Sequence, residues 1–406
     1  MLTDKTVVLG ITGGIASYKA ADLASKLTQA GAKVHVILTK SAQEFITPLT
    51  LESLTNQTVI TSIFQTNAQH HANHIAFAEM ADIVVIAPAT ANIMAKIAHG
   101  IADDMLSCTV LATQAPVVVV PAMHTAMWEN PATRENTAKL RERGFYIIEP
   151  ATGRLASGGF GPGRFPDTES IIGHIRKVLG KNGDLAGKHL VVTAGGTQEP
   201  IDPVRIISNR SSGKMGYAIA EAARDRGAEV ILITAPTGIP KPVGMELIPV
   251  ETAGQMKAAV EKAVARADAL IMAAAVADYQ VAQIAPQKIK KETGNLTLEL
   301  VQTADILAEV KGEFIKIGFA AESQDLVANA RRKLEKKKLD LVVANDIKEE
   351  NCGFGTDTNR VVLIGQDGTP ENLPLMRKPE VADRLLDRVV RLFKVKGKPV
   401  RPNTQK

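Results

Sequence analysis

The stretch "KTVVLGITGGIASYKAADLASKLTQAGAKVHVILTK", residues Lys5 to Lys40, decides the fold. An apolar strand runs into a glycine turn, a helix follows, and a second apolar strand ends the stretch. Strands that are apolar along their whole length are typical of a parallel sheet with helices on both faces. The stretch therefore predicts a βαβ unit and an α/β fold.

The same pattern returns in the second half of the chain. Residues 188–197 are a strand and glycine turn, residues 215–227 a helix, and residues 228–236 a strand. We therefore predict two doubly wound, Rossmann-like α/β domains, with a boundary in the glycine-rich and charged stretch 180–188. The expected domains are residues 1–183 and 184–394, followed by a flexible tail, 395–406.

Composition narrows the functional classes. A length of 406 residues fits two or three domains, and a net charge of +5 with 4% aromatic residues argues against nucleic-acid binding. Two distant cysteines, Cys108 and Cys352, indicate neither a disulfide framework nor a metal cluster and favour a reducing cytoplasm. No signal peptide opens the chain, and no apolar run approaches the roughly 18 residues of a membrane helix.

The stretch "ISNRSSGKMG", residues 207–216, superficially resembles a nucleotide-binding P-loop. A P-loop has Ser or Thr after its lysine, to bind Mg²⁺, and a glycine five positions before its second glycine. Here Met215 follows Lys214, and Ser208 stands in place of the first glycine. The stretch therefore needs another function.

The glycine turn after the first strand, "GITGGIAS", is a candidate phosphate site. Ligands of open α/β sheets lie beyond the carboxyl ends of the strands, and a helix N-terminus there binds phosphate through backbone N–H groups. A tight turn with nothing bound is the alternative. An NAD site would have an acidic residue after the second strand, whereas this chain has Thr39, Lys40 and Ser41. These residues suit flavin mononucleotide (FMN) better than a dinucleotide.

Longer motifs carry a family resemblance. The stretches 10–23 ("GITGGIASYKAADL"), 74–106 ("HIAFAEMADIVVIAPATANIMAKIAHGIADDML") and 121–128 ("PAMHTAMW") resemble the flavin-dependent cysteine decarboxylases. Residues 193–216, "AAAVADY", "KIKK" and "GFAAES" resemble phosphopantothenate-cysteine ligase. In this order, over nearly the whole chain, they resemble the bacterial bifunctional coenzyme A biosynthesis proteins.

For the first, flavodoxin-like domain the resemblance implies an oxidative decarboxylation. FMN oxidises the cysteine side chain of 4'-phosphopantothenoylcysteine to a thioaldehyde, carbon dioxide leaves, and hydride returns to the ene-thiol. His74 matches the catalytic histidine, and His124 and Met127 fall on the substrate-binding segment. The FMN-binding positions are Gly13, Gly14, Ile15, Thr39, Ser41, Thr90, Asn92 and Ala102.

Two residues depart from the family pattern. His124 stands where many relatives have Asn, and Ser157 stands where many have a cysteine that donates the last proton. A serine hydroxyl is a much weaker acid than a thiol. Either another group supplies this proton or the final reduction is impaired, and the rest of the glycine-rich lid around Ser157 favours the first interpretation.

For the second domain the resemblance implies activation of 4'-phosphopantothenate by CTP. An acyl-cytidylate forms and cysteine attacks it, so the chemistry depends on positioning and charge neutralisation. Asn209, otherwise a turn residue, would contact the acyl group, and Lys288, otherwise part of a solvated basic run, would stabilise charge on phosphorus. Mg²⁺ would bridge the triphosphate. The CTP-binding positions are Ala273, Ala274, Ala275, Asp278, Lys288, Thr303, Ala304, Asp305, Ile306, Phe319, Lys333 and Lys337.

The expected partners are small molecules and further copies of the chain, and the resemblance implies a homo-oligomer built as a dodecamer. Two other interpretations stay open at this point. The repeated βαβ units are compatible with a nicotinamide-dependent oxidoreductase. Ser157 and His124 are compatible with a non-catalytic flavoprotein subunit.

Overall fold

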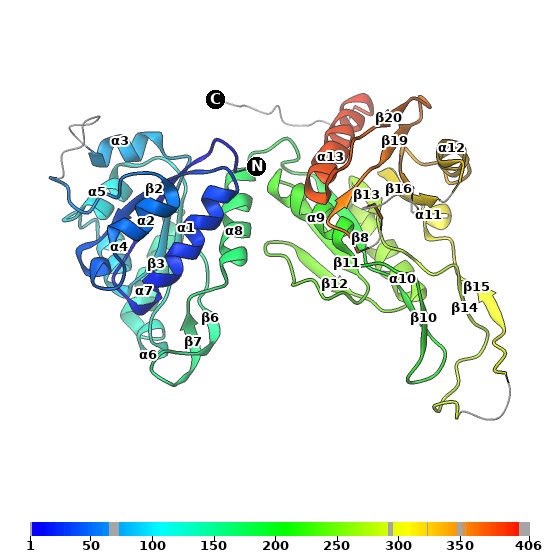
Figure 1. Cartoon of the computed structure of the whole chain (residues 1–406), viewed down its shortest axis with the longest axis horizontal. Coiled ribbons are helices and arrows are strands. Elements are labelled where there is room, and N and C mark those ends of the chain that lie inside the picture. The colour runs from blue at the N-terminus through cyan, green and yellow to red at the C-terminus, as the bar shows by residue number, and fades with distance from the viewer. Residues whose placement is uncertain are drawn as a thin grey trace. The chain divides into compact units, whose positions relative to one another are not determined.

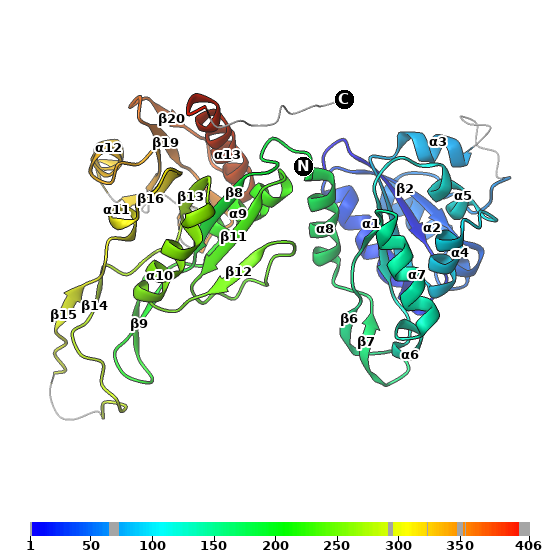
Figure 2. The same cartoon turned by 180° about the vertical axis from the view of Figure 1, so that it is seen from behind.

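The computed structural model describes residues 2–64, 73–290, 295–322, 324–346, 352–353 and 355–397. The chain divides into two compact units, Met1–Leu179 and Gly180–Lys406, and each contains a sheet covered by helices (Figures 1 and 2). The prediction of two doubly wound α/β domains is confirmed. Of the expected tail, Val395 ends the last helix, and residues 398–406 lie outside the described residues.

The sheet of the first unit is parallel throughout. Its order is β2-β1-β3-β4-β5, so the direction of strand addition reverses between β1 and β3. Ligands of doubly wound sheets bind at such a reversal, beyond the carboxyl ends of the strands. In sheet order the strands are Lys33–Leu38, Thr6–Ile11, Ile83–Ala89, Val117–Pro121 and Tyr146–Ile147.

Helices bury both faces of this sheet. In α1 the apolar residues Ala20, Leu23, Ala24 and Leu27 recur at helical spacing and are fully buried against it. Each leucine contributes roughly 1.5–3 kcal/mol of burial. One face packs against α1 (Lys19–Gln29), α2 (Pro48–Thr55) and α8 (Thr168–Gly180). The other packs against α3 (Asn73–Met80), α4 (Ala91–His99), α5 (Met105–Ala112) and α7 (Pro131–Glu142).

Shorter elements border the carboxyl ends of these strands. The 3-10 helices η1 (Ile15–Tyr18) and η2 (Lys40–Glu44) follow β1 and β2. The short helix α6 (Thr125–Trp128) follows β4 and contacts the antiparallel hairpin of β6 (Ala151–Arg154) and β7 (Phe160–Arg164). This hairpin contains the glycine-rich stretch for which the sequence predicted a lid, and it is called the lid hairpin, or lid, below.

The second unit has an eight-stranded sheet of order β12-β11-β8-β13-β16-β17-β19-β20. The first six strands are parallel, and β19 and β20 add antiparallel at the edge. The order reverses between β8 and β13, which places a second ligand crevice there. In sheet order the strands are Glu246–Pro249, Glu229–Thr234, His189–Ala194, Ala269–Met272, Ile315–Glu322, Leu341–Asp346, Val362–Gly365 and Pro370–Asn372.

Two layers of helices cover this sheet. The adjacent helices α9 (Lys214–Asp225) and α13 (Lys378–Val395) bury one face, with Leu385, Val389 and Phe393 fully inside. The other face packs against α10 (Ala253–Ala263), α11 (Ile306–Glu309) and α12 (Leu326–Lys336), and the 3-10 helix η3 (Val264–Arg266) follows α10.

In the described part of the second unit, three strand pairs lie outside the eight-stranded sheet. The hairpin of β9 (Gln198–Pro200) and β10 (Ile206–Ser208) leads to the stretch "NRSSGK". An arm made of β14 (Tyr279–Val281), β15 (Leu300–Gln302) and the described residues 282–290 and 295–299 extends away from the sheet (Figures 1 and 2). A third pair joins β18 (Thr358–Asn359) to β21 (Met376–Arg377). None of the helices in the described ranges is long and apolar enough to cross a lipid bilayer.

Candidate active sites

A buried threonine joins the two strands at the reversal point of the first sheet. The hydroxyl of Thr12 donates to the carbonyl oxygen of Pro88 at 2.7 Å and accepts from the backbone N–H of Thr90 at 3.0 Å. These bonds fix the end of β1 against the start of α4. Thr12 was not among the residues expected from the sequence, because its partners lie 76 and 78 positions away.

The glycine turn lies directly against the loop after β2. A Cβ atom on Gly13 would lie only 2.4 Å from Cβ of Ser41, so a side chain at position 13 would force the two loops apart. The turn is closed by Ser17, whose hydroxyl lies 2.8 Å from the Thr12 carbonyl oxygen. The structure thus brings Gly13 beside Ser41, and Gly14 and Ile15 follow Gly13 in the same turn.

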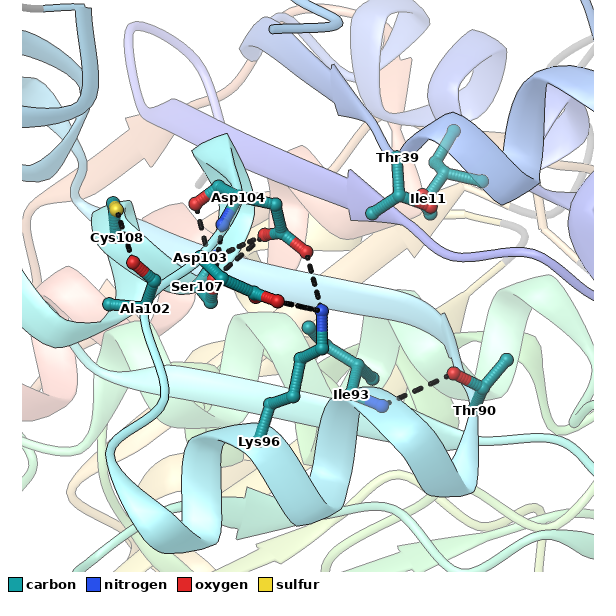
Figure 3. Close-up of polar contacts among 10 residues, drawn as sticks. All are labelled: Ile11, Thr39, Thr90, Ile93, Lys96, Ala102, Asp103, Asp104, Ser107 and Cys108. Carbon is teal, nitrogen blue, oxygen red and sulfur yellow. Dashed lines mark hydrogen bonds and ion pairs between the residues drawn. The ribbon is translucent and has the colours of Figure 1, made fainter. Parts of the chain in front are cut away.

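Charged residues order the opposite side of this crevice (Figure 3). Lys96 of α4 pairs with Asp103 at 2.7 Å and with Asp104 at 3.4 Å, and Asp104 accepts from the N–H of Ser107 to cap α5. Hydrogen bonding to Asp103 raises the pKa of Lys96, and the same bond lowers the pKa of Asp103. The loop that contains Ala102 is therefore held to both helices.

Thr90 is the N-cap of α4, and its hydroxyl accepts from the N–H of Ile93 at 3.3 Å (Figure 3). Nearby, Thr39 bonds the carbonyl oxygen of Ile11, which joins the ends of β1 and β2. Asn92, in the first turn of α4, is exposed. Seven of the eight predicted FMN positions therefore follow the carboxyl ends of β1, β2 and β3, and the eighth, Ala102, lies in the loop between α4 and α5.

A cavity of about 170 Å³ opens at this edge, between Thr39, Lys40, Phe64, Asp103 and Met105. Ligand pockets commonly measure about 300–1,000 Å³. The hydroxyls, the lysine and the glycine turn fit a phosphate-bearing flavin, but the cavity is too small to enclose one. The described lining of this cavity can hold a phosphate group but not a whole flavin.

His74 is the second residue of α3 and is half-buried. Its Nδ1 atom is buried and has no hydrogen-bond partner among the described residues. An unpaired buried ring nitrogen is costly, which makes this imidazole a candidate for contact with a ligand or a second chain. Both views of the first unit place α3 at the end opposite α6 and the lid hairpin (Figures 1 and 2).

The lid and α6 are joined by backbone contacts. The N–H of Met123 donates to the carbonyl oxygen of Gly163 at 3.0 Å, and Thr125 Oγ1 donates to the carbonyl oxygen of Pro162. His124 caps α6 by accepting the Ala126 N–H, and its ring is exposed. Exposed Met127 lies on α6, and exposed Ser157 lies on the turn between β6 and β7. The structure thus groups the lid with His124 and Met127, and separates all three from His74.

A much larger pocket, of about 760 Å³, occupies the crevice of the second sheet. Its walls come from the loop before α9, the segment after β13, and residues on β16 and α12. Eleven of the twelve predicted CTP positions line it, together with Asn209. Those eleven are Ala273, Ala274, Ala275, Asp278, Thr303, Ala304, Asp305, Ile306, Phe319, Lys333 and Lys337.

Two lysines face this pocket from one side of the sheet: Lys333 lies in α12, and Lys337 is the C-cap of that helix. Lys333 donates to the carbonyl oxygen of Phe319 at 2.6 Å, and Lys337 pairs with Asp305 at 2.9 Å. Burial lowers the pKa of Lys333, and the neighbouring charge of Lys337 lowers it further. Two close cations at a helix end are suited to a polyanionic ligand.

A second lysine pair, missed from the sequence, lines the same pocket from the other side of the sheet. Lys214 starts α9 and pairs with Asp357 at 2.6 Å, while Lys378 starts α13 and donates to the carbonyl oxygen of Gly353 at 3.1 Å. Burial lowers the pKa of Lys378, and the charge of Lys214 adds to this effect. Neither lysine belongs to a complete nucleotide-binding motif, and their proximity arises only from the packing of α9 on α13.

Lys288 is the one predicted CTP-binding residue that is not found in the described lining of the pocket. It is exposed in the connection between β14 and β15 and is not among the described lining residues. Lys291, the last residue of "KIKK", lies outside the described residues. In the described ranges, no three His, Cys, Asp or Glu side chains gather as metal ligands would.

Comparison with known proteins divides the chain at the same place. Residues 1–180 match the Flavoprotein family, and residues 185–393 match the family described as DNA/pantothenate metabolism flavoprotein C-terminal domain. The chain is 46% identical over 403 residues to the Coenzyme A biosynthesis bifunctional protein CoaBC of Bacillus subtilis (strain 168), covering 98% of this chain and 99% of that protein. It belongs to the bifunctional coenzyme A biosynthesis proteins.

Other members of this family show the same full-length similarity. The CoaBC protein of Vibrio vulnificus (strain YJ016) is 43% identical, covering 97% of this chain and 99% of that protein. The CoaBC protein of Mycobacterium bovis is 44% identical, and the match covers 95% of this chain and 96% of that protein. The family prediction made from the motifs is confirmed. These matches do not support a nicotinamide-dependent oxidoreductase.

Proposed function

We propose that this bifunctional coenzyme A biosynthesis protein converts 4'-phosphopantothenate to 4'-phosphopantetheine in two steps. Residues 184–394 ligate cysteine to 4'-phosphopantothenate with CTP, and residues 1–183 decarboxylate the product with FMN. The observation that carries the proposal is the pair of lysine clusters in the large pocket of the second unit. Lys333 and Lys337 face it from one side of the sheet, and Lys214 and Lys378 from the other.

Two cationic clusters in one pocket suit two phosphorylated substrates. We assign Lys333 and Lys337 to the triphosphate of CTP, and Lys214 and Lys378 to the phosphate monoester of 4'-phosphopantothenate. Asn209 lines the same pocket, and we assign to it the place where the carboxylate of the second substrate meets the α-phosphate of the first. Mg²⁺ is carried with the triphosphate, since a nucleotide and water supply most of its ligands.

The ligase residues act by positioning and charge neutralisation. An acyl-cytidylate forms when the substrate carboxylate attacks the α-phosphorus of CTP and pyrophosphate leaves. The cysteine amine then attacks the acyl carbon, and CMP leaves. No protein nucleophile is needed. Asn209 orients the acyl group and Lys288 neutralises the developing charge. Lys288 is carried by the arm between β14 and β15 and is not among the described lining residues of the pocket.

In the decarboxylase, FMN supplies the oxidation of the cysteine side chain and its later re-reduction. Gly13, Gly14, Ile15, Thr39, Ser41, Thr90, Asn92 and Ala102 hold the flavin. His74, whose buried Nδ1 has no described partner, holds the substrate and transfers a proton. His124 and Met127 bind the substrate under the lid. A group other than Ser157 supplies the last proton, because a serine hydroxyl is too weak an acid.

The separation of His74 from the lid supports a homo-oligomer. Residues assigned to one reaction lie at opposite ends of the same unit, so two copies would complete one flavin site (Figures 1 and 2). The small cavity at Thr39 supports the same conclusion. The family resemblance extends this to a dodecamer in the cytoplasm.

Mass spectrometry of products tests the proposal. The purified protein, with 4'-phosphopantothenate, cysteine, CTP and Mg²⁺, should release pyrophosphate, CMP, carbon dioxide and 4'-phosphopantetheine. Omitting any one reactant should stop the sequence at the corresponding step. A colourless protein that takes up no FMN, or a chain that does not consume CTP, would refute it. An accumulating ene-thiol would indicate a non-functional reductive step.

A further inference from the structure

A buried carboxylate lies at the turn of the β9–β10 hairpin. The hairpin turn spans residues 201–205, and the flanking Pro203 and Val204 are exposed, yet Asp202 is only 2% exposed. A buried carboxylate is costly unless its oxygens are hydrogen-bonded. Asp202 satisfies this condition with bonds to two different segments.

The two carboxylate oxygens have separate functions. Oδ1 accepts the N–H groups of Val204 at 2.7 Å and Arg205 at 2.8 Å, which closes the hairpin turn locally. Oδ2 accepts from the Arg205 guanidinium at 2.9 Å and from the N–H of Ile289 at 3.1 Å. Burial raises the pKa of Asp202, but the bonds from Val204, Ile289 and Arg205 outweigh it and lower the pKa, so the carboxylate is ionised.

Ile289 directly follows Lys288. Two further bonds attach the same part of the arm to the hairpin: Arg205 donates to the carbonyl oxygen of Ile289 at 3.0 Å, and the N–H of Ala285 donates to the carbonyl oxygen of Ile201 at 3.0 Å. The segment 285–289 has no helix or strand of its own. Its described long-range backbone contacts are therefore concentrated on this hairpin.

The same hairpin leads to Asn209. Strand β10 ends at Ser208, and the next residue lines the large pocket. The hairpin therefore connects the two residues assigned to the ligase reaction: Asp202 bonds Ile289, next to Lys288, and six residues of chain (203–208) separate Asp202 from Asn209. We propose that Asp202 is a positioning residue of the ligase, which holds the segment that carries Lys288 on the hairpin that leads to Asn209. This inference depends on the role proposed for Lys288.

The substitution Asp202→Asn separates the closing of the hairpin turn from the attachment of the Lys288 segment. An asparagine keeps one carbonyl oxygen to close the turn, but its NH₂ group cannot accept from Ile289 or pair with Arg205. We expect the kcat of ligation to fall roughly 10-fold, as for loss of a charged hydrogen bond, with KM for CTP nearly unchanged. Decarboxylation of added 4'-phosphopantothenoylcysteine should stay at the wild-type rate.

A double-mutant cycle with Lys288→Gln shows whether Asp202 acts through Lys288. If it does, Asp202→Asn should cost less than about 2-fold once Lys288 is replaced. The control Glu371→Gln also removes the carboxylate partner of an arginine, Arg388, and should leave both activities unchanged. The backbone amides of segment 285–289 should exchange hydrogen faster in Asp202→Asn than in the wild type, and at the wild-type rate in the control Glu371→Gln.

Three outcomes overturn the inference. Fully additive losses would mean that Asp202 acts independently of Lys288. Unchanged kcat and exchange in Asp202→Asn, with Lys288→Gln inactive, would leave the role of Lys288 intact and remove that of Asp202. A wild-type rate of ligation in Lys288→Gln would refute the role assigned to Lys288, and with it the proposal that Asp202 acts through Lys288. A wild-type chain that does not consume CTP refutes the proposed function itself, and this is measured separately.

Discussion

The side-chain amide of Asn209 donates a hydrogen bond to the carbonyl oxygen of Val276, with a nitrogen–oxygen distance of 3.0 Å. These residues are 67 positions apart and lie on either side of the sheet reversal between β8 and β13. The bond crosses the crevice in which both substrates are proposed to react. It fixes the amide orientation, because the NH₂ group faces Val276 and the amide oxygen is left for other contacts.

Replacing Asn209 with Asp should abolish ligation and spare decarboxylation. An ionised aspartate cannot donate to Val276, and its charge would repel both the substrate carboxylate and the triphosphate. We expect pyrophosphate release to fall about 100-fold or more, by analogy with loss of a positioned polar group in other active sites. Carbon dioxide release from added 4'-phosphopantothenoylcysteine measures the other reaction. Parallel loss of both activities would contradict two separable sites.

The lysine pair at the starts of α9 and α13 should determine affinity for 4'-phosphopantothenate. We expect Lys214→Ala to raise KM for this substrate about 10-fold, as for loss of a charged hydrogen bond, and to leave KM for CTP nearly unchanged. Lys394→Ala is the control, since Lys394 is an exposed lysine on the same helix as Lys378. An equal rise in both KM values would mean that the two clusters do not discriminate between the substrates.

Affinity for CTP should weaken at alkaline pH earlier than an ordinary lysine would allow. Burial and the charge of Lys337 lower the pKa of Lys333, so this ammonium loses its proton below the usual lysine pKa of about 10.4. For folding, the lowered pKa makes the protonated lysine unfavourable, and stability rises as pH increases through this pKa. The affinity for CTP changes in the opposite direction: it falls as pH increases, because the triphosphate is bound by the protonated ammonium.

Initial rates at several CTP concentrations test this pH dependence. KM for CTP should rise with pH in wild type, while Lys333→Arg should remove the rise because a guanidinium stays protonated. If the arginine variant kept the wild-type dependence of KM on pH, a group other than Lys333 would be responsible for it.

Local patterns predicted the parts of each site that lie close in sequence. The βαβ periodicity identified both sheets, and contiguous motifs with a family resemblance identified the pocket residues Ala273 to Ala275, Asp278, and Thr303 to Ile306. The residues missed have distant partners. Thr12 bonds Pro88, and Lys214 pairs with Asp357, 143 positions away. No spacing rule links such residues, because only the packed sheet and helices bring them together.

The lid should be sensitive to a single methyl group at Gly163. This residue has φ of +135°, and an added Cβ would lie 2.1 Å from the carbonyl oxygen of Met123. Gly163→Ala should displace the lid from α6, at a local cost of about 1–3 kcal/mol, and slow decarboxylation without affecting ligation. Gly158→Ala is the control, since Gly158 also has positive φ but open space around its Cβ position. Equal effects of the two variants would attribute the loss to backbone strain alone.

The final reduction should respond to the acidity of residue 157. A cysteine thiol, with a pKa of about 8.5, is a far stronger acid than a serine hydroxyl. Because Ser157 is exposed on the lid turn, Ser157→Cys should fold normally and accelerate conversion of the ene-thiol to 4'-phosphopantetheine by about 10-fold or more. Ser157→Ala should still form 4'-phosphopantetheine, because another group supplies the proton in the wild type. Time-resolved mass spectrometry of both species distinguishes the cases. Arrest of Ser157→Ala at the ene-thiol would identify the serine itself as the donor.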